Sequence, residues 1–240
     1  MPIRNKPNLY YGPTYTGDHY IQRRLKLYAN MVNPYIKSGS RILDVGGYTG
    51  DLIPFVKKGV GYFIVDADRP ALQVARKKGA RVKQVFFDEE EISFNGVKKF
   101  DAIICTETLE HLKDPKRHVD TFKALLKEDG ILVISMPNEN SIYHRIMVFL
   151  GFGVDSHIFE LYKHLHFPTV SQILKFLGEN FEIIKVDYYI NPSGAGSRFS
   201  FLGKVFMFLP DDFWYFLARF SPSLFARGVV VLCKLKVQPK

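Results

Sequence analysis

The most informative segment of the chain reads Arg41-Ile-Leu-Asp-Val-Gly-Gly-Tyr-Thr-Gly-Asp-Leu52. Its aliphatic run ends abruptly in glycines, which is how a parallel α/β sheet brings bare backbone close to a ligand. A second apolar run, Tyr62-Phe-Ile-Val-Asp66, ends in an acid 20 residues beyond Gly46. A carboxylate at that position can accept hydrogen bonds from both hydroxyls of a ribose. The two segments together predict a nucleoside-binding site.

The glycine pattern differs from the dinucleotide-binding fingerprint G-x-G-x-x-G. The third glycine of that fingerprint would fall on Asp51, whose carboxylate would repel a diphosphate. The residues instead spell Asp-x-Gly-x-x-x-Gly at Asp44, Gly46 and Gly50. This pattern resembles motif I of the class I S-adenosylmethionine-dependent methyltransferases. The chain departs from the family pattern at Tyr48, where many members carry another glycine.

Strand and helix signals alternate from residue 41 onward and predict a doubly wound α/β sheet. The expected strands are residues 40–45, 61–65, 81–87, 100–106 and 130–135, and the expected helices are 18–37, 52–58, 68–79, 114–129, 141–150 and 169–178. Residues 181–190 and 229–237 read as two further strands with no crossover helix of the usual kind between them. They match the antiparallel edge of the class I fold. The resemblance therefore implies a Rossmann-like methyltransferase fold, with a mostly parallel seven-stranded sheet and an antiparallel terminal strand.

The length of 240 residues fits a single methyltransferase domain, residues 1–240. A helical cap segment, residues 1–39, would precede the first strand. Residues 191–228 would form an apolar, aromatic insertion between the last two strands. Three interpretations of this insertion stay open: a lid or wall of the acceptor pocket, a membrane-contacting patch, or a homodimer contact.

Positive charge is concentrated at the two ends of the chain. The sequence holds 33 Lys and Arg against 24 Asp and Glu, a net charge of +9. Residues 1–41 contribute +6 and residues 191–240 contribute +5, which leaves −2 between them. Such ends suit an anionic partner such as a lipid headgroup, a phosphate or RNA, or they form an ordinary solvated surface. No RNA-binding signature accompanies them, so nucleic acid is the less favoured partner.

The two cysteines, Cys105 and Cys233, both lie in apolar runs that read as strands. Buried free thiols fit a reducing cytosol better than a disulfide scaffold does. The first residues are polar and do not resemble a signal peptide. No window reaches the roughly 18 apolar residues of a membrane-spanning helix. We therefore expect a cytoplasmic protein, with peripheral membrane association as the alternative.

A second resemblance indicates a particular branch of the methyltransferase family. The run Phe100-Asp-Ala-Ile-Ile-Cys-Thr-Glu-Thr-Leu-Glu-His-Leu-Lys-Asp-Pro115 resembles the strand-four region of the ubiquinone/menaquinone-biosynthesis-like branch. The run His164-Leu-His-Phe-Pro-Thr169 is similar to that branch as well. Together the resemblances cover roughly residues 40–190. They imply transfer of a methyl group from S-adenosyl-L-methionine.

The resemblance implies that the glycine loop contacts this cofactor through its backbone. Gly46, Gly47 and Gly50 would meet the methionyl and ribosyl parts. Asp44 would lie near the ammonium group, directly or through water. A purely local role is the alternative for Asp44, whose carboxylate could cap its own loop.

Four further positions match cofactor-binding residues of the family. Asp66 would hold the ribose hydroxyls. Asp88 would meet the adenine amino group, with Phe87 packed on the ring, and Thr106 would face the amino-acid portion. Asp88 could instead cap a turn, and Thr106 could simply end a strand.

A general base is needed only where the acceptor arrives protonated, as an alcohol, phenol or carbon acid does. His111, which follows the fourth strand, is the candidate catalytic residue; its alternative role is to fasten the local turn. His157, His164 and His166 have no cysteine or carboxylate pair at ligand spacing, so we expect no metal site.

The sequence thus predicts a methyltransferase that acts on a small or lipid-like acceptor. An RNA methyltransferase is the alternative within the same chemistry, prompted by the basic ends. A non-catalytic cofactor-binding or membrane-associated protein of the same fold is the alternative from another class.

Overall fold

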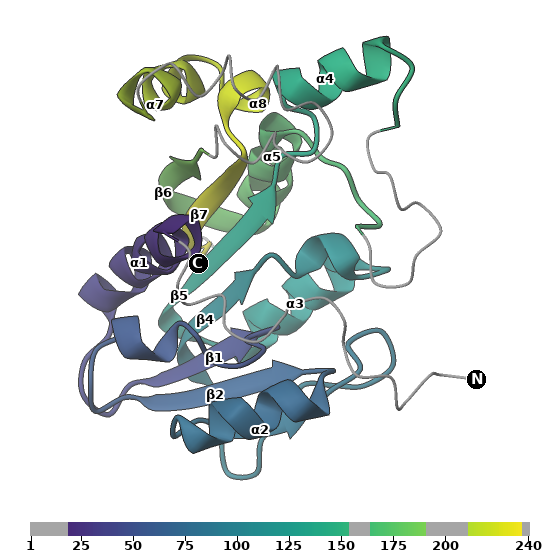
Figure 1. The fold of residues 1–240 in the computed structure, drawn as a ribbon. Helices are drawn as coiled ribbons and strands as arrows, with labels where there is room; N and C mark the ends of the chain where they lie inside the picture. Colours follow the sequence, from purple (N-terminus) through teal and green to yellow (C-terminus); the bar gives the residue numbers. More distant parts are fainter. Residues whose placement is uncertain (1–18, 154–163, 191–210, 237–240) are drawn as a thin grey trace. The chain divides into compact units, whose positions relative to one another are not determined.

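The computed structural model describes residues 19–153, 164–190 and 211–236. The described strands form a seven-stranded sheet in the order β3-β2-β1-β4-β5-β7-β6 (Figure 1). Their bounds are β1 Arg41–Val45, β2 Gly61–Asp66, β3 Arg81–Gln84, β4 Phe100–Thr106, β5 Leu126–Pro137, β6 Phe181–Tyr189 and β7 Gly228–Leu235. β1 pairs in parallel with both β2 and β4, whereas β6 and β7 are antiparallel. The expected fold class is confirmed.

Helices connect most of these strands. The α-helices are α1 His19–Val32, α2 Arg69–Lys77, α3 Pro115–Leu125, α4 Ile142–Phe149, α5 Val170–Asn180, α7 Asp211–Phe220 and α8 Pro222–Phe225, and the short 3-10 turns are η2 Asn33–Tyr35, η3 Ile53–Phe55 and η4 Leu109–His111. None of the described helices is long and apolar enough to cross a membrane. The segments 1–18 and 191–210, which belong to the expected cap and insertion, lie outside the described residues.

The described chain divides into two compact units. The first contains the residues up to Thr106 together with Lys116–Val133, and the second contains Glu107–Pro115 together with the residues from Ile134 onward. In the first unit β1 is central and almost wholly buried, as expected of a parallel strand that is covered on both faces. Helix α2 packs against β2 and β3 (Figure 1).

Helix α2 begins where the sequence predicts. Asp68 is its N-cap and accepts a hydrogen bond from the backbone N–H of Ala71 at 2.9 Å. Pro70 occupies the first turn, and the helix is followed by Gly79 with φ +92°. The cap holds the start of α2 directly behind the end of β2, so the loop between them is short and fixed.

The prediction of a helix over residues 52–58 is wrong. Only the 3-10 turn η3 forms there, and Val56 is already extended. The side chain of Asn33 explains the difference, because it donates to the carbonyl of Phe55 and accepts from the N–H of Lys57, both at 2.9 Å. These two backbone groups are thus satisfied from outside the segment. The expected first helix, 18–37, also ends early, because Pro34 opens η2 after Val32.

For two strands, the predicted boundaries are wrong. The third strand, expected over 81–87, stops at Gln84, because Phe86 enters a turn that Glu90 closes by accepting the Phe86 N–H at 3.0 Å. The fifth strand, expected over 130–135, begins at Leu126, and α3 ends at Leu125. The pairing of Lys127 with Asp101 of β4 at 2.7 Å favours an extended chain there.

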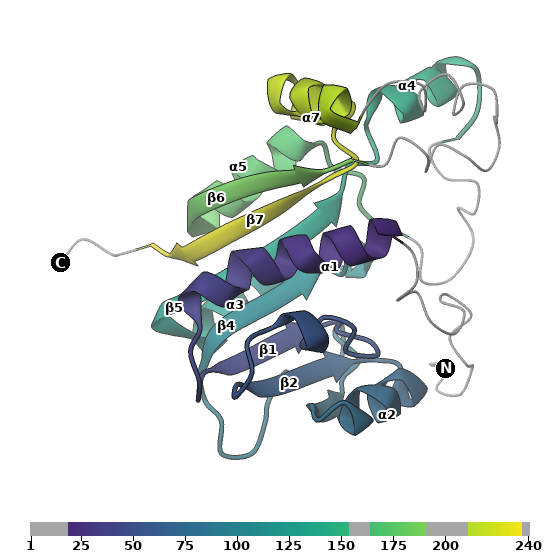
Figure 2. The ribbon, with the colours of Figure 1, turned by 60° about the vertical axis from the view of Figure 1, so that its left-hand side comes forward.

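The second unit is built on the β6–β7 ladder, in which Phe181 pairs with Leu235 and Tyr189 with Gly228. Helix α5 packs against both strands, and α7 contacts β6 and α8 (Figure 2). The helix expected from residue 169 is confirmed, and it starts with a capping box in which Thr169 and Gln172 bond each other's backbone. The cysteines of β4 and β7 are buried free thiols, as expected.

Candidate active site

The loop that follows β1 holds several residues in the left-handed region of backbone conformation. Gly46 has φ +75° and Gly50 has φ +71°. The N–H of Gly46 donates to the carbonyl of Val65 in β2 at 2.8 Å, and the N–H of Gly50 donates to Gly47 at 2.8 Å. Tyr48 also has a positive φ of +46°. The family's usual glycine at this position therefore has a physical reason, and Tyr48 adopts the same conformation at a cost in backbone strain.

Close packing, and not only backbone conformation, requires glycine in this loop. A Cβ on Gly47 would lie 2.7 Å from the carboxylate of Asp44, and a Cβ on Gly50 would lie 2.7 Å from Cδ1 of Ile53. Both distances are shorter than real carbon contacts allow. The loop backbone thus lies directly on the Asp44 carboxylate.

Asp44 is buried in β1 and has a hydroxyl partner. The Tyr62 hydroxyl of β2 donates to its Oδ2 at 2.7 Å. Burial raises the pKa of Asp44 to about 7, although the hydrogen bond from Tyr62 works in the opposite direction. A carboxylate in this state gains most from a cationic partner, because a positive charge would restore its ionised form.

Asp66 ends β2 beside the same loop. Its Oδ2 accepts from the N–H of Tyr48 at 2.9 Å, and its Oδ1 accepts from the N–H of Asp68 at 2.8 Å. Burial raises the pKa of Asp66 to about 6, and these backbone donors oppose that rise. A carboxylate has about four lone-pair positions, so the group can still accept a hydrogen bond from a ligand hydroxyl.

The remaining predicted cofactor residues lie at the same edge of the first unit. Thr106 follows Cys105, which pairs with Val45, so Thr106 ends β4 level with the start of the glycine loop. The N–H of Val85 donates to the carbonyl of Asp66 at 3.0 Å, which brings the segment after β3 beside Asp66. In this fold class, the carboxyl ends of the parallel strands are where ligands bind.

Phe87 and Asp88 follow Val85 by two and three residues. The ring of Phe87 packs edge-on against His118, with 6.2 Å between the ring centroids. The carbonyl of Asp88 accepts from the Arg117 guanidinium at 3.4 Å. Both residues are partly exposed, and Arg117 and His118 of α3 therefore fix the loop that carries them.

His111, the predicted catalytic residue, belongs to the second unit. It ends the turn η4, and its ring lies edge-on to that of His164 with 4.7 Å between centroids. His164 in turn places Nδ1 3.0 Å from Oε1 of Glu139. The assignment of His111 as a general base stays a prediction. Sequence reasoning missed Glu139, which has no local motif to mark it.

Glu139 stands among cationic and imidazole groups. His144 Nε2 lies 3.1 Å from its Oε2, and the Arg227 guanidinium lies 3.2 Å from the same His144 nitrogen. Burial alone would raise the pKa of Glu139, but the hydrogen bond from His164 and the charge of Arg227 lower it to about 2. Glu139 is therefore a permanent anion that can orient the His164 ring.

Glu107 is a second acid that sequence reasoning missed. It has φ +51°, and its Oε1 accepts from the hydroxyls of Ser135 at 2.7 Å and Tyr189 at 2.8 Å. These bonds tie the segment after β4 to β5 and β6 within the second unit. The only local sequence signal is the position of Glu107 directly after a strand.

A family model described as a methyltransferase domain matches residues 17–186 of the chain. A curated relative, the ubiquinone biosynthesis O-methyltransferase of Glaesserella parasuis serovar 5 (strain SH0165), is 29% identical over 170 residues, which is 64% of this chain and 70% of that protein. The same enzyme of Alkalilimnicola ehrlichii is 35% identical over 107 residues, 42% of this chain and 43% of the relative. The match thus spans less than half of the second relative.

Solved structures share the fold. The N-methyltransferase NodS from Bradyrhizobium japonicum WM9, solved in complex with S-adenosyl-l-homocysteine, superposes with a TM-score of 0.58. The superposition covers 92% of this chain and 90% of NodS, at 12% sequence identity. At that identity the likeness concerns the architecture alone.

Proposed function

The chain belongs to the methyltransferase-domain family of S-adenosylmethionine-dependent enzymes, and from this premise we propose that it methylates an oxygen of a small, lipid-like acceptor. The observation that carries the cofactor half of the proposal is Asp66, held by the backbone of Tyr48 beside the glycine loop. The relatives named ubiquinone biosynthesis O-methyltransferase support the acceptor half.

The geometry of the first unit supports the proposed cofactor contacts. Asp66 accepts from the ribose hydroxyls, and the backbone of Gly46 and Gly47 lets the ligand approach without a side chain between. Asp44 attracts the ammonium group, because a nearby cation lowers the free energy of its buried carboxylate.

The segments that follow β3 and β4 complete the proposed cofactor site. Phe87 packs on the adenine and Asp88 accepts from its amino group, while Thr106 faces the amino-acid portion. The support for this placement is the hydrogen bond from Val85 to Asp66 and the strand register that ends β4 level with the glycine loop.

For methyl transfer, the main task of the protein is to align the acceptor with the methyl group of the cofactor. When bound, the cofactor would supply an electrophilic methyl group on a sulfonium, with a neutral sulfide as the leaving group. The acceptor hydroxyl must lose its proton to a base or to solvent. The contribution of the protein is to hold the reactants in line and to exclude water.

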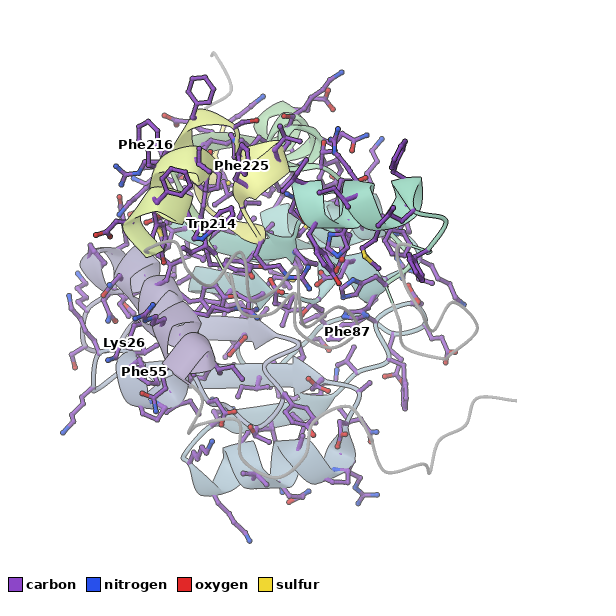
Figure 3. The ribbon with its side chains drawn as sticks, turned by 45° about the horizontal axis from the view of Figure 1, so that its top comes forward. Lys26, Phe55, Phe87, Trp214, Phe216 and Phe225 are labelled. Atoms are coloured by element: carbon purple, nitrogen blue, oxygen red, sulfur yellow. The ribbon has the colours of Figure 1, made fainter. Side chains whose placement is uncertain are left out.

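Two exposed helices of the second unit support a lipid-like acceptor and a peripheral membrane contact. Phe149 at the end of α4 is 88% exposed, and Phe216 and Phe220 of α7 are 66% and 83% exposed. Figure 3 shows the Phe216 ring directed away from the protein, whereas Trp214 of the same helix is directed inward and buried. Apolar rings of this kind suit the interface of a bilayer.

Basic residues accompany these rings. Arg145 lies one helical turn before Phe149, and Arg219 lies within one turn of Phe216; both arginines are exposed. We expect co-sedimentation with vesicles that contain anionic lipid, and weaker co-sedimentation after Phe216→Ser and Phe220→Ser together. If these rings instead form a dimer contact, analytical sedimentation without lipid should give the mass of a dimer.

The test of the function is methyl transfer from radiolabelled S-adenosylmethionine to phenols that carry alkyl tails of increasing length. The proposal expects labelled ether products, a rate that increases with tail length, and no product from the Asp66→Ala variant. Label in total RNA instead of the phenols would favour an RNA methyltransferase. Cofactor binding without any labelled acceptor would favour a non-catalytic protein.

A further inference from the structure

A short lysine-containing turn recurs before three neighbouring strands of the first unit. It reads Lys37-Ser-Gly39 before β1, Lys57-Lys-Gly59 before β2 and Lys77-Lys-Gly79 before β3. The three glycines have φ of +83°, +79° and +92° in chain order. A further pair, Lys98-Lys99, directly precedes β4. Each of these four strands is therefore entered from a turn or loop that carries lysine.

The sheet places these lysines along one edge. The four strands are neighbours in the order β3-β2-β1-β4 and run parallel, as β1 and β2 do in Figure 2. Parallel strands begin at the same edge, and the N–H of Gly39 joins two of the turns by donating to the carbonyl of Gly59 at 2.8 Å. With neighbouring strands about 4.8 Å apart, the four strand starts span roughly 14 Å.

One lysine before each strand is left without a counter-charge. We name these side chains the amino-edge row; in spatial order they are Lys77, Lys58, Lys37 and Lys98. All four are exposed, and none has an ion-pair partner among the residues that the structure describes. The lysines beside them differ, since Lys78 pairs with Asp51 at 2.6 Å and Lys99 donates to the carbonyl of Leu126 at 3.2 Å. A row of unneutralised ammonium groups attracts an anionic partner.

We propose that the amino-edge row binds the phosphate backbone of a single strand of nucleic acid. Its length of roughly 14 Å accommodates four to five phosphates at about 3.4 Å per nucleotide. That number lies within the site sizes of known single-strand binders. Lysine meets a phosphate as a compact point charge and carries no base readout. Binding at the row is therefore independent of nucleotide sequence.

Other anionic partners fit this edge less well. A site for a lipid surface combines lysines with apolar side chains that enter the interface. Among the described residues, the largest exposed rings belong to the second unit, at Phe149, Phe216 and Phe220, whereas the first unit exposes only Tyr35 and Val74 of its large apolar side chains. Lysine is depleted in protein–protein interfaces, which disfavours a protein partner. A linear array of charges matches a linear chain of phosphates.

The row is separate from the candidate active site. Lys37 precedes β1, and the glycine loop follows the same strand, so the two sites lie at opposite ends of β1. A nucleic acid at the row is thus a partner and not the methyl acceptor, and the inference goes beyond the proposed function. Net charge along the sequence did not reveal the row, because three of its lysines lie in the central part of the chain, whose net charge is −2.

The test is fluorescence anisotropy of a labelled oligouridine of about 20 nucleotides, titrated with the full chain at several salt concentrations. The logarithm of the association constant should fall with the logarithm of the salt concentration with a slope of about −2.8, since each of four phosphate contacts contributes about −0.7. Affinity should therefore decrease roughly 50-fold between about 50 and 200 mM KCl. A strand of mixed sequence and equal length should bind within about twofold.

A matched pair of variants removes the same charge from two different surfaces. Lys58→Gln with Lys77→Gln acts on the row, and Lys175→Gln with Lys185→Gln acts on exposed positions of the second unit. The first variant should make the slope shallower by about 1.4 and weaken binding more than about tenfold at about 100 mM salt. The control should bind within about twofold of the unchanged chain. Near-ultraviolet circular dichroism and S-adenosylmethionine binding on the same samples report folding and the cofactor site independently.

Three results would overturn the proposal. One is a folded chain that does not bind oligouridine, or binds it without the salt dependence. Another is an equal loss of affinity in the two double variants, which would trace the effect to net charge and not to the amino-edge row. The third is displacement of oligouridine, at equal charge concentration, by polyglutamate or by vesicles of anionic lipid. That result would assign the row to an acidic protein or to lipid headgroups.

Discussion

The hydroxyl of Tyr62 donates to Oδ2 of Asp44 at 2.7 Å, and both side chains are buried between neighbouring parallel strands. Burial raises the pKa of Asp44 to about 7, and the hydrogen bond from Tyr62 works against that rise. The pair therefore sets the pH at which the proposed ammonium-binding carboxylate is ionised.

Removal of the Tyr62 hydroxyl should shift cofactor binding along the pH axis. In Tyr62→Phe the pKa of Asp44 loses its main lowering influence and moves further above 7. We expect S-adenosylmethionine affinity about 3–10-fold weaker than that of the unchanged protein at pH 7, and a difference that shrinks as the pH rises toward 9, since one pKa unit is a factor of ten in ionisation. Calorimetry across that pH range measures both effects. An equal loss at every pH would mean that the hydroxyl acts only through packing.

The ligand-free protein should lose stability as the pH rises from about 4 to about 7. Asp44 and Asp66 have folded pKa values of about 7 and about 6, above their ordinary value of 3.8, so the folded state holds their protons more tightly than the unfolded state. Their stabilising contribution is therefore complete below pH 3.8 and is lost as the pH passes through the folded pKa values. Glu139, whose folded pKa of about 2 lies below its ordinary value of 4.5, contributes stability in the opposite sense, and that contribution is nearly complete above pH 4.5.

Thermal melting between pH 4.5 and pH 8 measures this dependence. The Asp44→Asn variant keeps an acceptor for Tyr62 but cannot ionise, so its melting temperature should change less over the window. A variant with the same slope as the unchanged protein would contradict the assignment of the slope to Asp44.

Gly50 should be intolerant of a side chain for two separable reasons. Gly50→Ala places a Cβ 2.7 Å from Ile53 Cδ1 at φ +71°, whereas Gly79→Ala meets only the backbone strain, at φ +92° with no atom within 4 Å. We expect Gly79→Ala to cost about 1 kcal/mol of unfolding free energy. Gly50→Ala should cost roughly 1–3 kcal/mol more, through crowding, and should weaken cofactor binding. Urea denaturation compares the two, and equal losses would refute the crowding argument.

Gly228 should be the least replaceable glycine of the β6–β7 ladder. A Cβ there would overlap the Tyr189 hydroxyl and lie 2.7 Å from the carbonyl oxygen of Met136. Gly228→Ala should therefore expel Tyr189 from its bond with Glu107 and cost more than about 2 kcal/mol of unfolding free energy. In Gly178→Ala the new Cβ meets only Ile183, at 3.7 Å, so this helix substitution should be neutral or stabilising by up to about 1 kcal/mol. Chemical denaturation tests the pair, and similar midpoints would show that Tyr189 moves aside freely.

What could be predicted from the sequence is what local patterns encode. The run before Gly46 predicts a buried parallel strand, and Asp68 and Thr169 predict helix starts that the structure confirms. The error at residues 52–58 has a distant cause, because the side chain of Asn33 takes over hydrogen bonds that a helix would have made. No local pattern contains that information.

The same distinction separates the two parts of the candidate site. Asp44 and Asp66 lie on adjacent strands whose ends are visible as motifs, so their proximity follows from the fold class. Glu110, His164 and Glu139 meet through turns and backbone bonds that span long stretches of chain. Their assembly could be seen only once the structure was known.

The central claim is that the carboxyl edge around Asp66 binds S-adenosylmethionine. The most direct measurement is calorimetric binding of S-adenosylmethionine and S-adenosylhomocysteine, beside NAD, to the unchanged chain and to Asp66→Ala. Asp51→Asn serves as the control, because it removes an acid of the same loop whose partner is the partly exposed Lys78. Micromolar binding of both sulfur compounds, lost in Asp66→Ala, kept in the control and absent for NAD, is the predicted result. A folded protein that binds neither compound, or binds them equally after Asp66→Ala, would contradict the claim.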